Sequence, residues 1–260
     1  MPNYLLNLIF RLGHWVRRRR FAPQLAFLRA RLSPEGYLGL RLTVGALVLI
    51  GASWLFGGIA EDVITNDPLT IFDANVAAWL HEHATPTLTA VMVFISFLGS
   101  TLFVSGVVFA TAVWLLWRSH WYRLATLVLA VPGGMLLNVL LKHAFRRGRP
   151  VFDDPLLTLT SYSFPSGHAM ASTLLYGALA VFAVSNLKAW RWRVLAVLFA
   201  VLLIALIDFS RVFLGVHYLS DVLAGSAAGL AWLALCVTSV DTLRRHRRVQ
   251  LKNTQSEVKS

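Results

Sequence analysis

The sequence of 260 residues contains a single cysteine, Cys236, and few charged residues. One cysteine excludes an intrachain disulfide and any metal site built from several cysteines. Charged residues make up 14% of the chain, compared with about 25% in an average soluble domain. Hydrophobic residues make up 57%, and the mean hydropathy is +0.64. These values exclude an ordinary water-soluble domain and predict an all-α, polytopic membrane protein.

Long runs without charged residues indicate where the chain crosses the membrane. A spanning helix needs about 20 apolar residues. The run 84–117 is too long for one such helix and too short for two with a turn, so we expect Gly99 and Ser100 to divide it into an interfacial helix and a span. The bundle is predicted to contain six spans, at 42–60, 101–117, 124–141, 168–185, 194–210 and 222–240.

Acidic residues are scarce too, with 12 Asp and Glu against 24 Lys and Arg and a formal net charge of +12. Most basic residues flank the apolar runs, in the segments 1–41, 118–123, 188–193 and 244–259. This placement is typical of cytoplasmic anchors that contact anionic lipid headgroups, and it argues against a nucleic-acid partner. Six spans put all four segments on one side, so both termini are predicted to be cytoplasmic, in an inner or plasma membrane.

The same distribution of charge predicts three parts of the chain. Residues 1–37 are expected to form a basic amphipathic cytoplasmic segment, in which 4–32 lie as a helix on the inner leaflet. Residues 38–240 are expected to form the six-helix membrane domain, and residues 241–260 a basic cytoplasmic tail.

A further set of polar residues falls at the ends of the predicted spans. Ionisable residues at such positions are candidates for a functional site. They form three clusters: KHAFRRGRP at 142–150, FPSGH at 164–168, and SR followed by a histidine and an aspartate at 210–221. The predicted topology places all three on the side opposite the termini, which favours one shared site.

Each cluster contains residue types that suit a phosphate group. Lys142, Arg149 and Arg211 could together neutralise a phosphoryl group, because lysine supplies a compact charge and arginine a planar fork. Ser166 and Gly167 open a predicted helix, whose free backbone N–H groups form an anion site.

The third cluster adds a histidine and a carboxylate. His217 and Asp221 are four residues apart and are therefore neighbours on one helical face. A carboxylate that holds one ring nitrogen leaves the other nitrogen free to act as a nucleophile. The pair therefore suits nucleophilic attack on phosphorus.

The three clusters resemble the signature of the type 2 phosphatidic acid phosphatases, also called lipid phosphate phosphatases. Their superfamily includes bacterial acid phosphatases and vanadium haloperoxidases. The signature reads K-x6-R-P, P-S-G-H and S-R-x5-H-x3-D, and residues 142–221 match every fixed position. The resemblance implies that five residues bind phosphate: Lys142, Arg149, Ser166, Gly167 and Arg211.

The resemblance also implies the catalytic roles. His217 would attack phosphorus and form a phosphohistidine, His168 would protonate the leaving group, and Asp221 would orient His217. The family reaction uses neither a metal nor another cofactor. The expected activity is hydrolysis, at the extracytoplasmic face, of a lipid phosphomonoester or pyrophosphate. The expected substrates are phosphatidylglycerophosphate, phosphatidic acid or undecaprenyl pyrophosphate.

Two other kinds of function stay open at this point. An enzyme that removes or transfers phosphate on lipid A would use the same histidine chemistry with a different acceptor. A transporter or a scaffold could retain the fold without the reaction. The intact clusters argue against a scaffold, and the lack of an obvious duplicated half argues against a transporter.

The neighbouring charged residues have less specific predictions. Arg146 and Arg147 are expected to contact either a second phosphate of the substrate or lipid headgroups. Asp208 is expected to have a structural, hydrogen-bonded role. Asp153 and Asp154 are expected to face water, because carboxylates would repel a bound phosphate.

Overall fold

The computed structural model describes residues 40–65, 68–157 and 159–257, so the amphipathic helix predicted within 4–32 lies outside the described residues. The described residues form helices joined by turns and loops, with no strand among them, which confirms the predicted all-α class. The helices are α2 (Leu40–Thr65), α3 (Pro68–Glu82), α4 (Pro86–Phe97), α5 (Thr101–Trp117), α6 (Trp121–Phe145), α7 (Gly167–Asn186), α8 (Trp190–Phe213) and α9 (Leu219–Glu257).

Six helical stretches of the described chain are long and apolar enough to cross a membrane, which confirms the predicted number. They are Leu42–Thr65, Pro86–Trp117, Trp121–Phe145, Gly167–Asn186, Trp190–Phe213 and Leu219–Leu251. The helices run past the predicted spans because the apolar run marks only the part of a helix that lies in hydrocarbon. The second stretch is broken where the sequence predicts, since Ser100 caps α5 by accepting a hydrogen bond from the Phe103 N–H at 3.3 Å.

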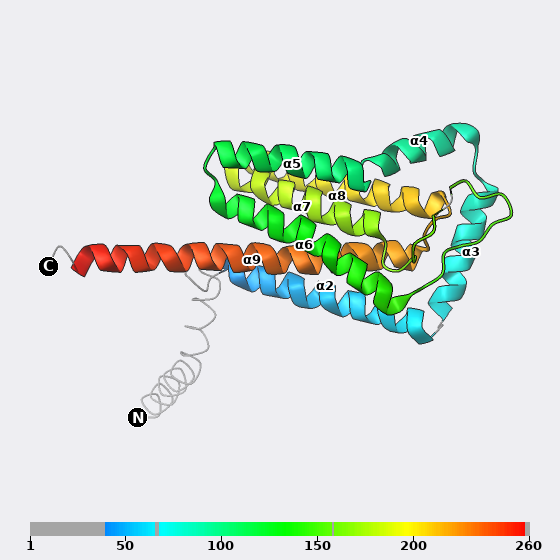
Figure 1. Cartoon of the computed structure of the whole chain (residues 1–260), viewed down its shortest axis with the longest axis horizontal. Coiled ribbons are helices and arrows are strands. Elements are labelled where there is room, and N and C mark those ends of the chain that lie inside the picture. Colours follow the sequence, from blue (N-terminus) through cyan, green and yellow to red (C-terminus); the bar gives the residue numbers. More distant parts are fainter. Residues whose placement is uncertain (1–39, 66–67, 158, 258–260) are drawn as a thin grey trace, which may run out of the picture. The chain divides into compact units, whose positions relative to one another are not determined.

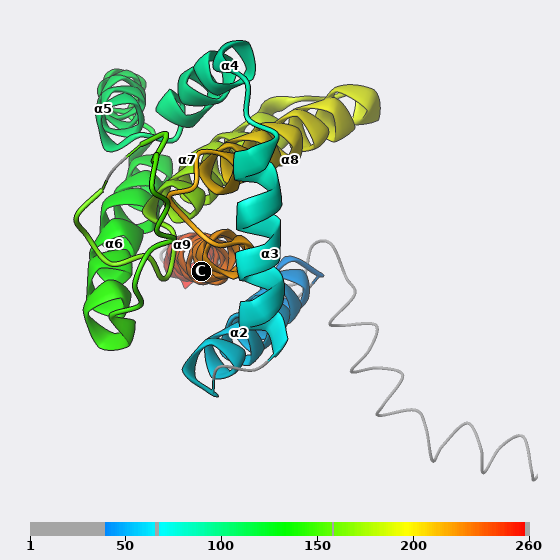
Figure 2. The ribbon, with the colours of Figure 1, turned by 90° about the vertical axis from the view of Figure 1, so that its right-hand side faces the viewer.

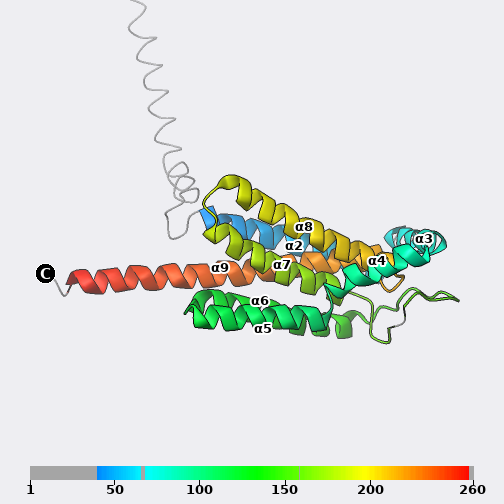
Figure 3. The same cartoon turned by 90° about the horizontal axis from the view of Figure 1, so that it is seen from above.

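The chain divides into two compact units. One unit comprises residues 1–45 and 242–260, and its described part consists of the start of α2 and the C-terminal part of α9. The other unit, 46–241, contains the remaining helical residues and every candidate site residue. Within it, α5, α6, α7 and α8 lie side by side, and α3 crosses the end where the 146–166 segment also lies (Figures 1 and 3).

The sequence did not predict α3, which lies between the first two spans. Its buried residues are Asp73, Ala77 and Leu80, a spacing that puts them on one face of the helix. This helix packs against α8. A carboxylate is thereby buried together with two apolar side chains at the end of the bundle.

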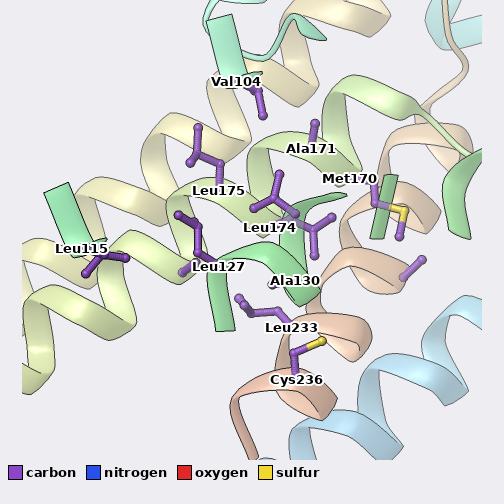
Figure 4. Packing of buried hydrophobic residues seen from close by; sticks show 13 residues of the cluster. Val104, Leu115, Leu127, Ala130, Met170, Ala171, Leu174, Leu175, Leu233 and Cys236 are labelled. Atoms are coloured by element: carbon purple, nitrogen blue, oxygen red, sulfur yellow. The ribbon is translucent and has the colours of Figure 1, made fainter. Parts of the chain in front are cut away.

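The core of the larger unit is formed by α5, α6, α7 and α9. Leu127, Leu174 and Leu175 are fully buried there and pack with residues of the other helices (Figure 4). Gly225 on α9 allows a close approach to α7, because a Cβ at this position would lie 2.6 Å from the carbonyl oxygen of Ser166. This contact places the start of α7 beside the start of α9, where two of the three sequence clusters lie.

Candidate active site

The three clusters meet at the end of the bundle that α3 crosses. Helices α6 and α8 end there, and α7 and α9 begin there (Figure 2). The 146–166 segment joins α6 to α7, and a short turn, 214–218, joins α8 to α9. Gly215 in this turn has a φ of +68°, a conformation that glycine adopts without strain. The turn brings His217 to Ser163 and Arg149 of the 146–166 segment and to Asp221 of α9.

The imidazole of His217 is 2% exposed and has a polar group on each side. Its Nδ1 lies 3.2 Å from the Ser163 hydroxyl and 3.4 Å from Oδ2 of Asp221. Its Nε2 lies 3.3 Å from Nη1 of Arg149. Because a guanidinium can only donate, this contact requires a lone pair on Nε2, and the proton of the neutral ring is then on Nδ1. Burial lowers the pKa of His217 to about 4, although the hydrogen bond and charge of Asp221 act in the opposite direction.

The carboxylate of Asp221 is held by several donors. It accepts hydrogen bonds from the Tyr218 N–H at 2.9 Å, from the Arg147 guanidinium at 2.7 Å and from the Ser163 hydroxyl. The Ser163 hydroxyl donates to Asp221 and can therefore accept from His217 Nδ1. The histidine is thus oriented both by Asp221 and by a serine that the signature does not contain.

Lys142 and Arg149 face the same region from α6 and from the segment that follows it. Lys142 Nζ donates to the carbonyl oxygens of Tyr162 at 2.5 Å and of Ser163 at 3.2 Å. Arg149 Nε donates to the carbonyl of Ser161 at 2.7 Å, and Nη1 donates to that of Val216 at 2.5 Å. Burial lowers the pKa of Arg149, and the charge of Asp221 partly offsets this effect. These bonds fix two cations beside His217.

Arg211, in the last turn of α8, is 2% exposed. One end of its guanidinium is fixed, because Nη1 donates to the Ser96 hydroxyl of α4 at 2.5 Å. Nε and Nη2 are buried and make no hydrogen bond to any of the described residues. Two donor nitrogens with no protein acceptor in the described chain are suited to the oxygens of a phosphoryl group.

The start of α7 supplies the remaining parts of the site. Ser166 is the N-cap, and its hydroxyl accepts a hydrogen bond from the Ala169 N–H at 3.5 Å. The N–H groups of Gly167 and His168 are in the first turn, where they have no intrahelical partner. The side chain of His168 is close enough to Arg211, Arg149, Lys142 and His217 to interact with them electrostatically. The structure therefore brings the eight candidate site residues of the three clusters to one end of the bundle.

Arg147 is where the structure corrects the sequence analysis. The sequence predicts a contact with a second phosphate or with lipid headgroups and gives no sign of the two protein partners that its guanidinium has in the structure. Arg147 forms ion pairs with Asp73 at 2.9 Å and with Asp221 at 2.7 Å. Arg146 is exposed, and its Nε donates to the carbonyl of its neighbour His143 at 3.0 Å.

The other charged residues lie as expected. Asp208 accepts a hydrogen bond from the Ser226 hydroxyl at 2.6 Å. Asp153 and Asp154 are exposed.

Sequence reasoning missed four residues at the site: Asp73, Ser96, Ser163 and Ser220. Three are serines. A serine in an apolar sequence does not by itself indicate a functional site, because serine also occurs as a small packing residue between membrane helices. Asp73 had a weak signal, since it is an isolated carboxylate within an otherwise apolar stretch.

The helical membrane fold and this histidine-centred, cation-lined site together define a class, the membrane-embedded phosphatases. The family model described as "PAP2 superfamily" matches residues 121–245. Phosphatidylglycerophosphatase B of Bacillus subtilis (strain 168) is 36% identical over 166 residues, which are 63% of this chain and 80% of that protein. An undecaprenyl-diphosphatase of Sulfolobus acidocaldarius is 28% identical over 184 residues, which are 69% of this chain and 83% of that protein.

A solved structure also relates the chain to the PAP2-type phosphatases. The chain is similar to the crystal structure of a transmembrane PAP2-type phosphatidylglycerolphosphate phosphatase from Bacillus subtilis, with a TM-score of 0.67 and 30% identity. The likeness covers 72% of this chain and 93% of that one. The chain belongs to the PAP2 superfamily. It is a multi-pass membrane lipid phosphatase.

Proposed function

We propose that this lipid phosphatase hydrolyses the phosphomonoester of phosphatidylglycerophosphate, with His217 as the nucleophile. The observation that carries the proposal is the setting of His217: its Nδ1 faces Ser163 and Asp221, and its Nε2 faces the guanidinium of Arg149. The identity with a phosphatidylglycerophosphatase supports the choice of substrate.

The reaction proceeds in two transfers. His217 Nε2 attacks phosphorus, and the bond between phosphorus and the lipid oxygen breaks as His168 gives that oxygen a proton. His168 then takes a proton from water, whose oxygen attacks the phosphohistidine. The bond between phosphorus and nitrogen breaks, and inorganic phosphate leaves.

Five residues act on the phosphoryl group during both transfers: Lys142, Arg149, Ser166, Gly167 and Arg211. The three cations balance the charge of the oxygens, and the N-terminus of α7 adds backbone N–H groups. Asp221 keeps the proton of His217 on Nδ1 and stabilises the positive charge that develops on the ring. No step in this scheme requires a metal.

The site faces the extracytoplasmic side in this proposal. The basic segments flanking the spans support cytoplasmic termini, and the three spans that precede α7 then put its start on the other side. The lipid tail stays in the bilayer while the headgroup reaches His217.

The test is phosphate release by the purified protein in detergent with a chelator present. The panel contains phosphatidylglycerophosphate, phosphatidic acid, undecaprenyl pyrophosphate and a short water-soluble ester. We expect fastest release from phosphatidylglycerophosphate, none by His217→Asn, and normal release by His143→Asn, whose histidine is exposed. Release from the soluble ester but from no lipid contradicts the proposed substrate class.

Undecaprenyl pyrophosphate is the second candidate, because a relative that covers 69% of this chain is an undecaprenyl-diphosphatase. The same panel separates the two, since fastest release from the pyrophosphate selects this alternative. Transfer of the phosphate to an added lipid A acceptor, with no free phosphate, would identify a phosphotransferase. A protein that binds these lipids but releases no phosphate would be a transporter or a scaffold.

A further inference from the structure

We infer that Asp73 and Arg147 are positioning residues for the reaction: Asp73 of α3 fixes the guanidinium of Arg147, and Arg147 fixes the carboxylate of Asp221 that orients His217. The inference rests on the proposed role of His217. It makes α3, which contains none of the signature residues, part of the catalytic apparatus.

The guanidinium of Arg147 lies between two carboxylates. Its Nη1 donates to Oδ1 of Asp221 at 2.7 Å, and its Nη2 donates to Oδ2 of Asp73 at 2.9 Å. Nη1 also donates to the Ser220 hydroxyl at 2.6 Å, and the guanidinium lies over the ring of Tyr218 at 4.4 Å from its centroid. These contacts leave the guanidinium little freedom to rotate.

Asp73 is fully buried and is fixed by the N-terminus of α9. Its Oδ1 accepts a hydrogen bond from the Ser220 N–H at 3.0 Å, and its Oδ2 accepts one from the Ser220 hydroxyl. Asp221 follows Ser220 directly in the chain. Asp73 therefore fixes the backbone beside Asp221 as well as the arginine that binds its side chain.

Arg147 matches the two carboxylates in both charge and shape. Burial acts to lower the pKa of Arg147, but the charges and hydrogen bonds of Asp221 and Asp73 act more strongly, and the net result is a raised pKa. The guanidinium presents a separate nitrogen to each carboxylate, which the single nitrogen of a lysine cannot do. A buried charge that loses its partner is strongly destabilised, so each of the three groups depends on the other two.

This network controls how much of the negative charge of Asp221 acts on His217. A neutral residue at 147 would leave that charge less compensated and would raise the pKa of His217. A neutral residue at 73 would leave Arg147 to neutralise Asp221 more fully, and the pKa of His217 would fall. The two substitutions are therefore expected to shift the acid side of the pH profile in opposite directions.

Other charged groups also act on His217, and they remain in every variant. They are Asp221 on α9, Arg149 in the 146–166 segment, Arg211 on α8 and His168 on α7, while Lys142 on α6 acts on Asp221. A shift that differs in sign between two variants cannot come from these unchanged groups.

The experiment compares Asp73→Asn, Arg147→Gln and Arg147→Lys with the matched control Arg146→Gln, which changes the adjacent exposed arginine. The substrate is p-nitrophenyl phosphate, whose turnover does not depend on which lipid the protein uses. We expect kcat to fall by about 10- to 100-fold, the range known for residues that orient the ligands of metal sites, with KM changed by less than about threefold. Arg146→Gln should behave as the wild type.

The pH profiles supply the readout that a merely structural role would not move. The acid side should shift to higher pH in Arg147→Gln and to lower pH in Asp73→Asn. In Arg147→Lys the acid side should stay at its wild-type pH, because the positive charge is retained. Its kcat should still fall, because lysine lacks the forked donor group. The double variant Asp73→Asn/Arg147→Gln should lose less kcat than the product of the two single losses, since Asp73 acts in part through Arg147.

Gel filtration and thermal melting in detergent identify any variant that does not fold. If Asp73→Asn is one of these, the comparison of Arg147→Gln with Arg147→Lys still decides the question. Wild-type kcat in Arg147→Gln, shifts of the same sign in the Arg147→Gln and Asp73→Asn profiles, or a loss confined to KM overturns the inference. Failure to trap a wild-type phosphoenzyme on His217 refutes the proposed function instead, which keeps the two failures apart.

Discussion

The geometry of Arg211 supports a quantitative prediction about phosphate binding. Its Nη1 is fixed by Ser96, while Nε and Nη2 make no hydrogen bond to any residue in the described part of the chain. The guanidinium is therefore fixed before substrate arrives, and the two remaining donors can bind oxygens of the transferring phosphoryl group without reorganisation. Arg211→Met removes both donors and the charge while keeping an unbranched side chain.

The expected loss follows from the number of donors. One preorganised donor to transition-state charge is worth about 2.7–4 kcal/mol, or about 10²–10³ in kcat. Two donors on one group do not add fully, so Arg211→Met should lower kcat by about 10³. Arg211→Lys keeps the charge but lacks the fork and should lose about 10². Ser96→Ala leaves the donors in place and removes one hydrogen bond to the guanidinium, which should lower kcat by less than about tenfold.

The assay measures turnover of p-nitrophenyl phosphate and its inhibition by vanadate, which mimics the five-coordinate transition state. Vanadate affinity should fall in the same order as kcat across Ser96→Ala, Arg211→Lys and Arg211→Met. Arg146→Gln is the control for general loss of positive charge. Unchanged vanadate affinity in Arg211→Met would exclude Arg211 from the phosphate site and refute the reasoning.

Three further predictions concern the histidines and the topology. His168→Asn should lose most activity on a lipid monoester but clearly less on p-nitrophenyl phosphate, whose leaving group hardly needs a proton; equal losses would contradict the role of general acid. The pKa of His217 falls from 6.5 unfolded to about 4 folded, so the unfolded state binds more protons and about 3 kcal/mol of stability should be lost as pH falls from about 6.5 to 4. Melting of His217→Asn should depend less on pH over that window, and an unchanged dependence would contradict this assignment. With Cys236→Ala as background, a membrane-impermeant thiol reagent should label Asp154→Cys but not Lys188→Cys from outside intact cells; the reverse would place the site in the cytoplasm.

The sequence was sufficient to predict the number of spans and the meeting of the three clusters. Both depend on properties that a single sequence states directly: the length of uncharged runs, the positions of basic residues between them, and fixed spacings such as that of His217 and Asp221. The break between α4 and α5 was predictable for the same reason, because Gly99 and Ser100 interrupt an apolar run of known length.

The roles of the adjacent Arg146 and Arg147 could not be predicted from the sequence. Helix α6 ends at Phe145, and Arg146 takes a left-handed conformation with a φ of 50°. This conformation ends α6, so the side chains of the two adjacent arginines point in different directions. One side chain is exposed and the other is partly buried and paired with Asp73, a residue 74 positions away.

The position of Asp73 was hidden for a different reason. A carboxylate in an apolar stretch has no fixed spacing to its partners, since its contacts depend on how α3 crosses the bundle. Its two partners, Arg147 and the N-terminus of α9, come from segments that the sequence analysis assigned to lipid contact or to the signature alone. The three meet only in the folded chain, where α3 packs against α8 and Asp73 reaches Arg147 and the N-terminus of α9.

The electrostatics of the site explain why such a network is useful in this protein. A phosphate site needs several cations, and Arg149 and Arg211 act to keep His217 neutral and therefore nucleophilic. Asp221 acts in the opposite direction, because an uncompensated negative charge beside the ring would favour the protonated, inactive form of His217. The ion pair with Arg147 reduces that charge while the hydrogen bonds from Tyr218 and Ser163 keep the carboxylate in place. Asp221 can thus orient His217 without protonating it, and Asp73 keeps Arg147 where this balance requires it.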